Sequence, residues 1–376
     1  MKILLAADLH IGRGSTRVPT AHGDRGLSGA AAWGRIVDEA TAQRVDLLCL
    51  VGDVADESNR FWEAIGPLEH GIHRLRQAGM RTLAVAGNHD HEVLARLADQ
   101  LDPKSFTLLG RGGRWQRLPI ELDGKTRLVV DGWLLGHIHT PMLRREAPGR
   151  PFVLYPGSPQ ALDPGETGPH GAWLIEIEHG QTTTPQPLPL STVRYDTLDI
   201  DLSGVKAHGA FEAAVLDAIR THAEAAANES GDCLAHLSLR LHLHGRTDLS
   251  SELLTLSSRL TDGLEMTVQQ AMVGIEKVLV DTTPDIDLAE HARGNTPPAA
   301  LARLLLALEE PNPPADVRRL ISDAQEQLDQ VRRHRDYVAI ADTVWADEQT
   351  ARTTLKKQAQ ALLGRLLESN GNGINR

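Results

Sequence analysis

The chain has 376 residues, of which 41% are hydrophobic and 24% charged, and its formal net charge is −11. These values favour a globular protein of two or three domains, and the negative charge argues against a protein that coats DNA. They leave a nuclease open, because bound cations and a local groove can offset the charge near a site. With no run of 18 apolar residues and no secretory segment, we expect a cytoplasmic protein with no membrane partner.

Three strand–loop–helix repeats fill the first hundred residues. Apolar runs predict the strands, and apolar positions at helical spacing predict the helices that follow them. The expected strands cover residues 2–7, 45–51 and 82–86, and the expected helices cover 30–44, 61–78 and 91–100. This alternation predicts an α/β fold.

Each of these three strands is followed by residues of metal-binding type. The clusters are Asp8-Leu9-His10, Gly52-Asp53-Val54-Ala55-Asp56 and Gly87-Asn88-His89-Asp90. The carboxyl ends of strands in an α/β sheet lie at one edge, so the loops there can converge on a common site. Any one cluster could be polar loop residues that only cap a helix. Three in succession favour a metal site.

A fourth cluster, Gly136-His137-Ile138-His139, follows about a third of the way along the chain. Two histidines at i and i+2 of an extended segment point to the same side, so both can face one metal cluster. The pattern is weak by itself in a chain of 17 histidines, since His242 and His244 have the same spacing. It gains weight from the three clusters that precede it.

The remainder of the chain divides into three further parts. Strands at 152–155 and 173–178 complete a first domain, residues 1–190, and the proline-rich segment 184–190 is expected to be a linker. A βαβαβ pattern then predicts a small α+β domain at 191–284. In its middle strand four leucines face one way, and His236, Ser238, Arg240, His242 and His244 face the other, which favours a solvated face over a nucleic-acid surface.

A helical segment is expected at 285–368, with a disordered tail at 369–376. Apolar residues recur at helical spacing over residues 317–331 and 355–366. These two stripes can fold back on the chain or dock on a partner helix. The late position and high charge of the segment favour docking of these stripes on a partner helix.

The residue types indicate which ions the site would hold. Asp, Asn and His together suit Mn²⁺, Fe²⁺ or Zn²⁺ better than Mg²⁺ alone, and the absence of cysteine argues against a structural zinc site. Two such ions about 3.5–4 Å apart would activate water and hold both oxygens of a phosphoester displacement. Asp53 is the natural carboxylate to bridge them.

The ordered set of four clusters resembles the calcineurin-like metallophosphoesterases over about the first 180 residues. Within that family the chain looks like the DNA-repair nuclease branch, the SbcD and YhaO proteins. The segments that carry this finer resemblance are Tyr155-Pro156-Gly157-Ser158-Pro159-Gln160, Gly165-Glu166-Thr167-Gly168-Pro169, Val193-Arg194-Tyr195 and Glu276-Lys277-Val278. The resemblance implies a metallophosphoesterase β-sandwich flanked by helices, a small α+β capping domain and a helical C-terminal segment.

The resemblance also implies a role for each matched residue. Asp8, His10 and His139 would bind one metal, Asp53 would bridge, and Asn88 and His137 would bind the second. His89 would meet the phosphate and protonate the leaving oxygen, with Asp56 orienting its ring, because a carboxylate partner keeps an imidazole protonated and aimed.

One metal-binding histidine of the family pattern has no counterpart. It is expected between the third and fourth clusters, yet no histidine lies between His91 and His137, and residues 127–130 run almost directly into Asp131 and Gly132. A natural loss, an internal deletion in this chain, or replacement by His91 or His170 would each account for it. The second metal is therefore expected to bind more weakly.

The resemblance implies a DNA exonuclease or endonuclease subunit that hydrolyses phosphodiesters in DNA repair, with two Mn²⁺ ions as cofactor. The partners implied are DNA and an SbcC-like coiled-coil ATPase docked on the late helices, and a homodimer is left open. Two alternatives remain: a catalytically impaired member that acts as a DNA-repair scaffold, and a metallophosphatase that does not act on DNA.

Overall fold

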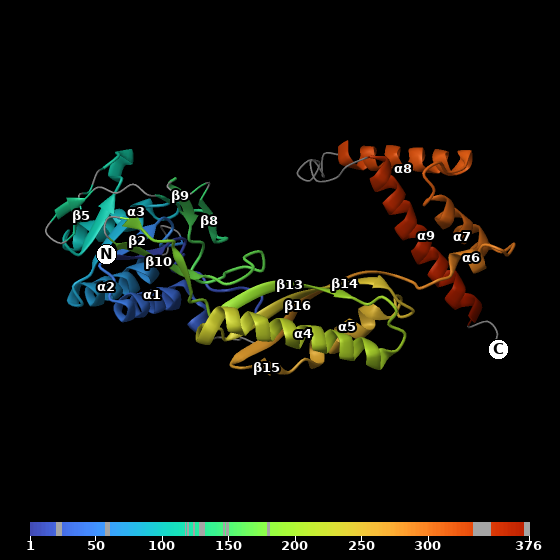
Figure 1. Ribbon diagram of the computed structural model, residues 1–376, viewed down its shortest axis with the longest axis horizontal. Coiled ribbons are helices and arrows are strands. Elements are labelled where there is room, and N and C mark those ends of the chain that lie inside the picture. The colour runs from blue at the N-terminus through green and yellow to red at the C-terminus, as the bar shows by residue number, and fades with distance from the viewer. Residues whose placement is uncertain are drawn as a thin grey trace. The chain divides into compact units, whose positions relative to one another are not determined.

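The computed structural model describes residues 1–19, 25–56, 61–116, 118, 120–122, 125–127, 132–145, 147, 150–178, 181–333 and 347–371 (Figure 1). The chain forms two compact units. The first consists of residues 1–198, 217–241 and 263–278, and the second of residues 199–216, 242–262 and 279–376. The short connection before Trp133, at residues 128–131, lies outside the described part.

A mixed seven-stranded sheet organises the first unit. Its strand order is β11-β10-β1-β2-β3-β4, and β12 pairs with β10. The strands are β1 (Lys2–Ala6), β2 (Leu47–Val51), β3 (Arg81–Val85), β4 (Phe106–Leu109), β10 (Gly171–Glu178), β11 (Gln181–Thr182) and β12 (Gln186–Pro189). Strands β1 to β4 are parallel, with Leu5 beside Cys49 and Cys49 beside Leu83. The clusters that follow β1, β2 and β3 therefore emerge at one edge.

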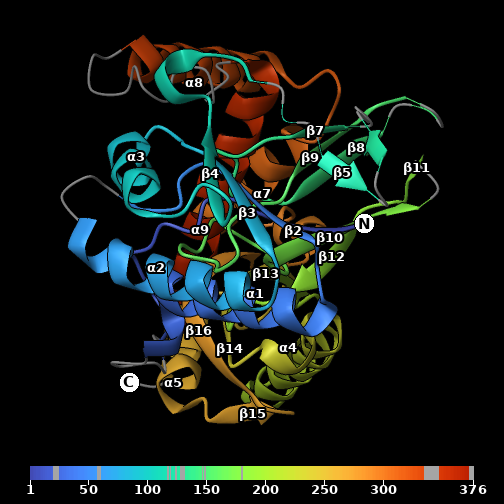
Figure 2. The same cartoon turned by 90° about the vertical axis from the view of Figure 1, so that its left-hand side faces the viewer.

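Both faces of this sheet are covered, as Figure 2 shows for the helical side. Helices α1 (Gly29–Gln43), α2 (Phe61–Gln77) and α3 (His91–Gln100) pack on Leu4, Leu48 and Leu50. The opposite face packs on a three-stranded sheet of order β7-β9-β8, built from β7 (Gly132–Leu134), β8 (Met142–Arg145) and β9 (Phe152–Tyr155). The first unit also contains a hairpin, β5 (Ile120–Leu122) with β6 (Lys125–Arg127), and 3-10 turns at Arg25–Leu27 and Arg111–Gly113. The predicted sandwich with flanking helices is confirmed.

Helices α1 and α2 are held together by one tryptophan. Trp33 is buried in α1, and its Nε1 donates a 2.8 Å hydrogen bond to the carbonyl oxygen of Pro67 in α2. A Cβ atom at Gly71 would lie 2.4 Å from that nitrogen, so the helices can approach closely only because Gly71 has no side chain. The two helices therefore pack closely against each other.

The proline-rich segment 184–190 is an edge strand rather than a linker. Within it, β12 runs antiparallel to β10, with Pro187 opposite Trp173 and Pro189 opposite Gly171. An edge strand tolerates proline because one side of its backbone has no partner to receive an N–H bond. Proline composition alone could not distinguish these two states. The expectation of a linker was therefore wrong.

The second sheet has the strand order β13-β14-β16-β15. Its elements are β13 (Val193–Asp201), α4 (His208–Ser230), a 3-10 turn (Gly231–Cys233), β14 (His236–Arg246), α5 (Leu253–Gly263), β15 (Met266–Val268) and β16 (Ala271–Thr283). The leucines of β14 are buried as predicted. On its other face His236 and Ser238 are buried too, and the Ser238 hydroxyl donates to the Arg17 carbonyl oxygen at 3.1 Å. The expected solvated face was therefore wrong at its first two positions.

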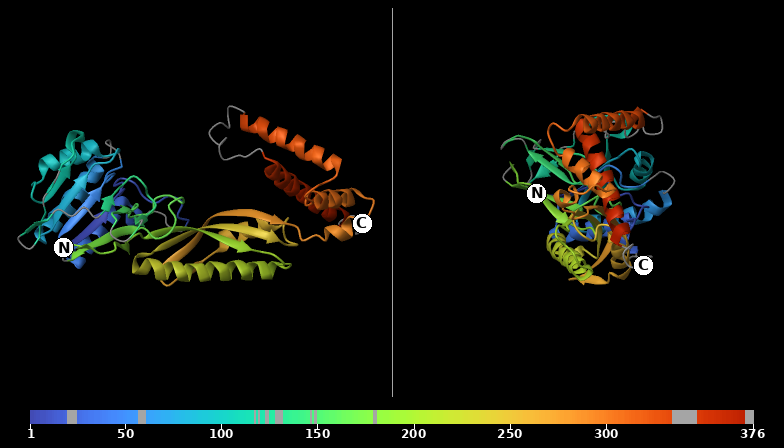
Figure 3. Two further views of the ribbon diagram at one scale, coloured as in Figure 1. Left: turned by 45° about the horizontal axis from the view of Figure 1, so that its top comes forward. Right: turned by 90° about the vertical axis from the view of Figure 1, so that its right-hand side faces the viewer.

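The C-terminal helices pack on one another, as Figures 1 and 3 show in orange and red. They are α6 (Leu288–His291), α7 (Pro297–Ala307), α8 (Ala315–Arg333) and α9 (Glu348–Gly371). The apolar stripe of α8, with Val317 and Ile321, packs on Leu308 and Ala351. The stripe thus folds back within the chain. Helix α9 also reaches Gly371, where a tail disordered from Ser369 was expected, and residues 372–376 lie outside the described part.

In the part of the chain that the structure describes, no helix has both the length and the apolar character needed to span a membrane.

Candidate metal centre

The backbone is strained where the four clusters meet. Asp8, His10, Asp53 and His137 all have positive φ, at 50°, 44°, 46° and 75°. Residues other than glycine rarely adopt this conformation, which costs of order 1–3 kcal/mol each unless the surroundings enforce it. Four such residues from three different loops are held at the same edge of the sheet. Strain concentrated in this way is typical of a functional site.

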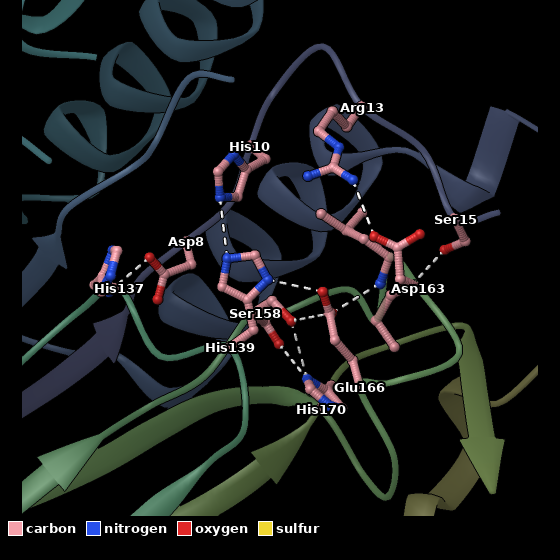
Figure 4. Close-up of polar contacts among 12 residues, drawn as sticks. Asp8, His10, Arg13, Ser15, His137, His139, Ser158, Asp163, Glu166 and His170 are labelled. Atoms are coloured by element: carbon pink, nitrogen blue, oxygen red, sulfur yellow. Dashed lines mark hydrogen bonds and ion pairs between the residues drawn. The ribbon is translucent and has the colours of Figure 1, made fainter. Parts of the chain in front are cut away.

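Asp8, His10 and His139 form a compact group of donor atoms (Figure 4). One donor atom from each lies within 4.8 Å of the others, and the Nε2 atoms of the two histidines are 3.2 Å apart. Nitrogen atoms that bind one ion at about 2.1 Å lie roughly 3 Å apart. Asp8 Oδ1 accepts a bond from the His137 N–H at 2.9 Å, whereas the buried Oδ2 has no hydrogen-bond partner. The orphaned oxygen and the two facing nitrogens fit a divalent metal ion.

Asp53, Asn88 and His137, the remaining ligands of the prediction, line a cavity of about 260 Å³. They come from the loops after β2, β3 and β7. Asp53 is buried, and its Oδ1 accepts a 2.9 Å bond from the His89 N–H, whereas the side chains of Asn88 and His137 are exposed. The structure therefore brings this set around a common hollow, but in a more open form than the first group.

Two glycines allow these loops to approach. A Cβ atom at Gly136 would lie 1.9 Å from the Val51 carbonyl oxygen, and one at Gly87 would lie 2.1 Å from Asp53 Oδ1. Both contacts are far below any real Cβ distance, so a larger residue would push the loops apart. The first glycine of the Gly-His-x-His cluster and of the Gly-Asn-His-Asp cluster is thus required because no side chain fits at either position.

The two predicted catalytic residues lie beside His10. The ring of His89 is exposed and meets the ring of His10 edge-on, with centroids 5.2 Å apart. Asp56 Oδ1 lies 3.2 Å from His10 Nδ1, so this carboxylate orients the ring of a predicted metal ligand. The expected role of Asp56 beside His89 stays a prediction.

Two further carboxylates take part that were given no role from the sequence. Asp90 is fully buried, and its oxygens accept bonds from the N–H groups of Gly87 at 2.7 Å and Val54 at 2.6 Å, which tie the second cluster to the third. Glu166 Oε1 lies 2.7 Å from His139 Nδ1. The segments that contain both residues were visible in the sequence, but the contacts with Val54 and His139 join positions 27 or more residues apart.

The electrostatics of Asp8 and His10 favour a bound metal ion over an empty centre. Burial is the main cause that raises the pKa of Asp8 to about 6 and lowers the pKa of His10. The hydrogen bond that His139 donates to the Glu166 carboxylate is the main cause that raises the pKa of His139. Burial opposes ionisation of Glu166, but the bonds it accepts from His139, the Leu162 N–H and Ser158 outweigh burial and lower its pKa. Neutral His10 is ready to bind, and a metal cation would stabilise the buried anionic form of Asp8.

Neither substitute for the missing histidine lines the hollow that Asp53, Asn88 and His137 share. His170 is buried, and its Nδ1 lies 2.8 Å from the Ser158 carbonyl oxygen and 3.1 Å from the Ser158 hydroxyl. His91 is exposed at the start of α3 and lines a separate cavity of about 380 Å³ with Gly87. Among the described residues, the second set therefore has the three ligands expected for it.

Comparisons with known proteins agree with this geometry. Residues 1–139 match the model of the calcineurin-like phosphoesterases, and residues 195–283 match that of the middle domain of metallophosphoesterase YhaO. An uncharacterized metallophosphoesterase, YhaO of Bacillus subtilis, is 26% identical over 200 residues, which cover 39% of this chain and 48% of the relative. The chain thus spans about half the length of the curated relative. Since 39% of 376 residues is fewer than 200, the relative has residues in the matched region that this chain lacks.

A crystal structure of a dimetal phosphatase from Danio rerio is 12% identical, with a TM-score of 0.29, and the match covers 48% of this chain and 93% of that one. A score this low carries no weight for the fold. The two matched domains and the strand-end site define the class: the chain is a calcineurin-like metallophosphoesterase. Within that class it is a YhaO-like member, because its second domain matches the YhaO middle domain.

Proposed function

We propose that this protein is a metal-dependent DNA phosphodiesterase, an exonuclease or endonuclease subunit that works with two Mn²⁺ ions. The observation that carries the proposal is the donor group of Asp8, His10 and His139, with Oδ2 of Asp8 lacking a partner and His89 beside it. Bound divalent ions would polarise the phosphoryl oxygens and activate water for the displacement. Mn²⁺ is proposed over Mg²⁺ because imidazole nitrogen is a large share of the donor set, with Fe²⁺ and Zn²⁺ as the next candidates.

The residues of the chain supply binding, orientation and a proton. Asp56 and Glu166 fix the rings of His10 and His139 through their Nδ1 atoms. His89, exposed at the rim, is proposed to donate a proton to the oxygen that leaves the phosphate. The choice of DNA rests on the match to the YhaO middle domain and on the resemblance of segments such as Val193-Arg194-Tyr195 to the DNA-repair nuclease branch.

The direct test is an assay with Mn²⁺ on single- and double-stranded DNA, alongside bis-p-nitrophenyl phosphate. We expect the wild-type chain to cleave both DNA and the small diester, and His89→Ala to lose the DNA activity. A clean preparation that cleaves the small diester and no DNA would make the protein a metallophosphatase without DNA specificity.

A second function is favoured by the openness of the Asp53, Asn88 and His137 set. With one donor fewer than the family pattern and two exposed side chains, this set could leave the protein as a DNA-repair scaffold with one tightly held ion. Elemental analysis after dialysis separates the two proposals. Two ions per chain favour the enzyme, and one ion with no turnover favours the scaffold.

We further propose a coiled-coil ATPase of SbcC type as partner, docked on the C-terminal helices. The apolar stripe of α8 is largely covered by α7 and α9, but Val331 is 50% exposed and Leu362 49% exposed. If these residues form the docking surface, Val331→Glu in the full chain and truncation after Pro298 should each abolish pull-down of such an ATPase. Retained binding in both variants would reject this surface. Sedimentation of the same variants would show whether the chain also forms a homodimer.

A further inference from the structure

A buried polar network extends away from the Asp8, His10 and His139 group through Glu166 (Figure 4). The Glu166 side chain is largely buried and accepts three bonds. Oε1 accepts a hydrogen bond from Nδ1 of His139 at 2.7 Å. Oε2 accepts one from the Ser158 hydroxyl at 2.7 Å and one from the Leu162 N–H at 2.9 Å. All of these partners therefore act as donors toward one carboxylate, which fixes its position.

The bond to His139 decides which nitrogen of the ring is free. Neutral imidazole carries one proton, and a carboxylate 2.7 Å from Nδ1 keeps that proton on Nδ1. Nε2 is then an unprotonated acceptor, and it is this atom that lies 3.2 Å from Nε2 of His10. Asp56 stands in the same relation to Nδ1 of His10 at 3.2 Å. The two rings are thus held by carboxylates on their outer sides and face each other with their inner nitrogens.

Ser158, which donates a hydrogen bond to Glu166, is itself held in place by the surrounding turn. His170 Nδ1 lies 2.8 Å from the Ser158 carbonyl oxygen, and Gly157, at φ 75°, brings this turn against the His139 carbonyl oxygen. The Ser158 N–H donates to that same carbonyl oxygen at 3.0 Å. The backbone of His139, a predicted metal ligand, is therefore hydrogen-bonded directly to the backbone of Ser158, which supports Glu166.

The segment that carries Glu166 is also attached to β13 of the second sheet, through Gly168. The Gly168 N–H donates to the Tyr195 carbonyl oxygen at 3.0 Å and lies 3.1 Å from Asp196 Oδ1. Asp196 is buried and also binds Arg194 at 2.7 Å and His222 at 2.8 Å. The segment that carries Glu166 therefore has fixed points on both sides.

We propose that Glu166 is the positioning residue of the first metal ion: through Nδ1 of His139 it fixes the tautomer and the ring direction that the ion requires. The inference deepens the proposed function, because it concerns the same centre. Partners of this kind commonly change metal affinity by about 10- to 100-fold. Ser158 supports the carboxylate, so its loss should have a smaller effect in the same direction.

The test measures Mn²⁺ binding by the full chain, using the electron paramagnetic resonance signal of free Mn²⁺ and no substrate. Glu166→Gln is expected to weaken the tighter site about 10- to 100-fold, since an amide offers a donor where Ser158 and Leu162 already donate. Ser158→Ala should weaken it several-fold. The matched control is Glu176→Gln, a partly exposed carboxylate paired with Lys2 at 3.2 Å, which should leave Mn²⁺ binding unchanged.

Turnover of bis-p-nitrophenyl phosphate provides a second readout. A positioning role predicts that saturating Mn²⁺ largely restores kcat of Glu166→Gln, with KM for the diester unchanged. Equal Mn²⁺ affinity in wild type, Glu166→Gln and Ser158→Ala, with all three folded by circular dichroism, would overturn the inference. If the wild type binds Mn²⁺ and cleaves no diester, the proposed function fails while the affinity comparison still decides the role of Glu166.

Discussion

Asp8→Asn is expected to stabilise the metal-free protein at pH 7 and to abolish metal-dependent hydrolysis. Asp8 is fully buried, and its pKa is raised to about 6, chiefly by burial. The folded chain thus binds this proton more strongly than the unfolded chain, whose reference pKa is 3.8. The stability contributed by the protonated carboxyl is complete below about pH 4 and is lost as the pH rises through about 6.

The size of the effect follows from the difference between the pKa of Asp8 in the folded chain and its reference value. This difference corresponds to at most roughly 3 kcal/mol, so we expect the Asp8→Asn substitution to raise the free energy of unfolding by about 1–3 kcal/mol at pH 7. The gain should vanish near pH 4. Asparagine keeps an oxygen for the His137 N–H but removes the anionic ligand, and turnover should fall by roughly 10³-fold or more.

Urea unfolding of both proteins in EDTA, at pH 7 and pH 4, measures the prediction. Asp90→Asn is the matched contrast. Asp90 is also fully buried with a raised pKa, chiefly from burial, but its two oxygens accept N–H bonds from Gly87 and Val54. An amide would place a donor against a donor there, so this variant should lose about 1–3 kcal/mol. Stabilisation of both variants, or of neither, would contradict the view that, of these two carboxylates, Asp8 alone is arranged for a metal.

The sequence predicts most of the first domain because its signals are local. Buried parallel strands are continuous apolar runs, and the residue directly after each run marks the edge where loops converge, as with Asp8 and Asp53. The same locality explains the failures. Pro187 and Pro189 have the composition of a linker, and only their pairing with β10 makes them a strand.

Local sequence signals could not predict the contacts of the two carboxylates that orient the metal-ligand histidines. Asp56 contacts His10 across 46 residues, and Glu166 contacts His139 across 27, so no periodicity connects either pair. The resemblance implied a role for Asp56 beside His89, and the contact of Asp56 with His10 is one that the sequence did not indicate. Partners of metal ligands depend on tertiary packing, and a single sequence records that packing only indirectly.

The second group of ligands shows what the shortened connection leaves in place. Asp53, Asn88 and His137 come from loops set by β2, β3 and β7, and each is fixed by its own strand. A ligand supplied by another strand can therefore be absent without moving these three. The first group owes nothing to the missing position, since Asp8, His10 and His139 meet without it. We therefore expect unequal affinity at the two proposed sites.

His89→Ala is expected to lower kcat for DNA by about 10²- to 10⁴-fold, the range for a lost general acid. The loss should be confined to chemistry, because the ring is exposed and the contact of this residue with Asp53 is made by its backbone N–H, which alanine retains. Stability should change by no more than about 0.5 kcal/mol, and Mn²⁺ affinity should stay the same.

The leaving group provides the decisive comparison. A DNA sugar oxygen departs as a strongly basic alkoxide and needs a proton, whereas p-nitrophenolate is stable without one. The deficit of His89→Ala should therefore shrink to about tenfold or less with bis-p-nitrophenyl phosphate. The exposed His91, two residues along the chain, is the control, and His91→Ala should retain both activities. Equal deficits of His89→Ala on the two substrates would assign His89 to phosphate binding instead of proton donation.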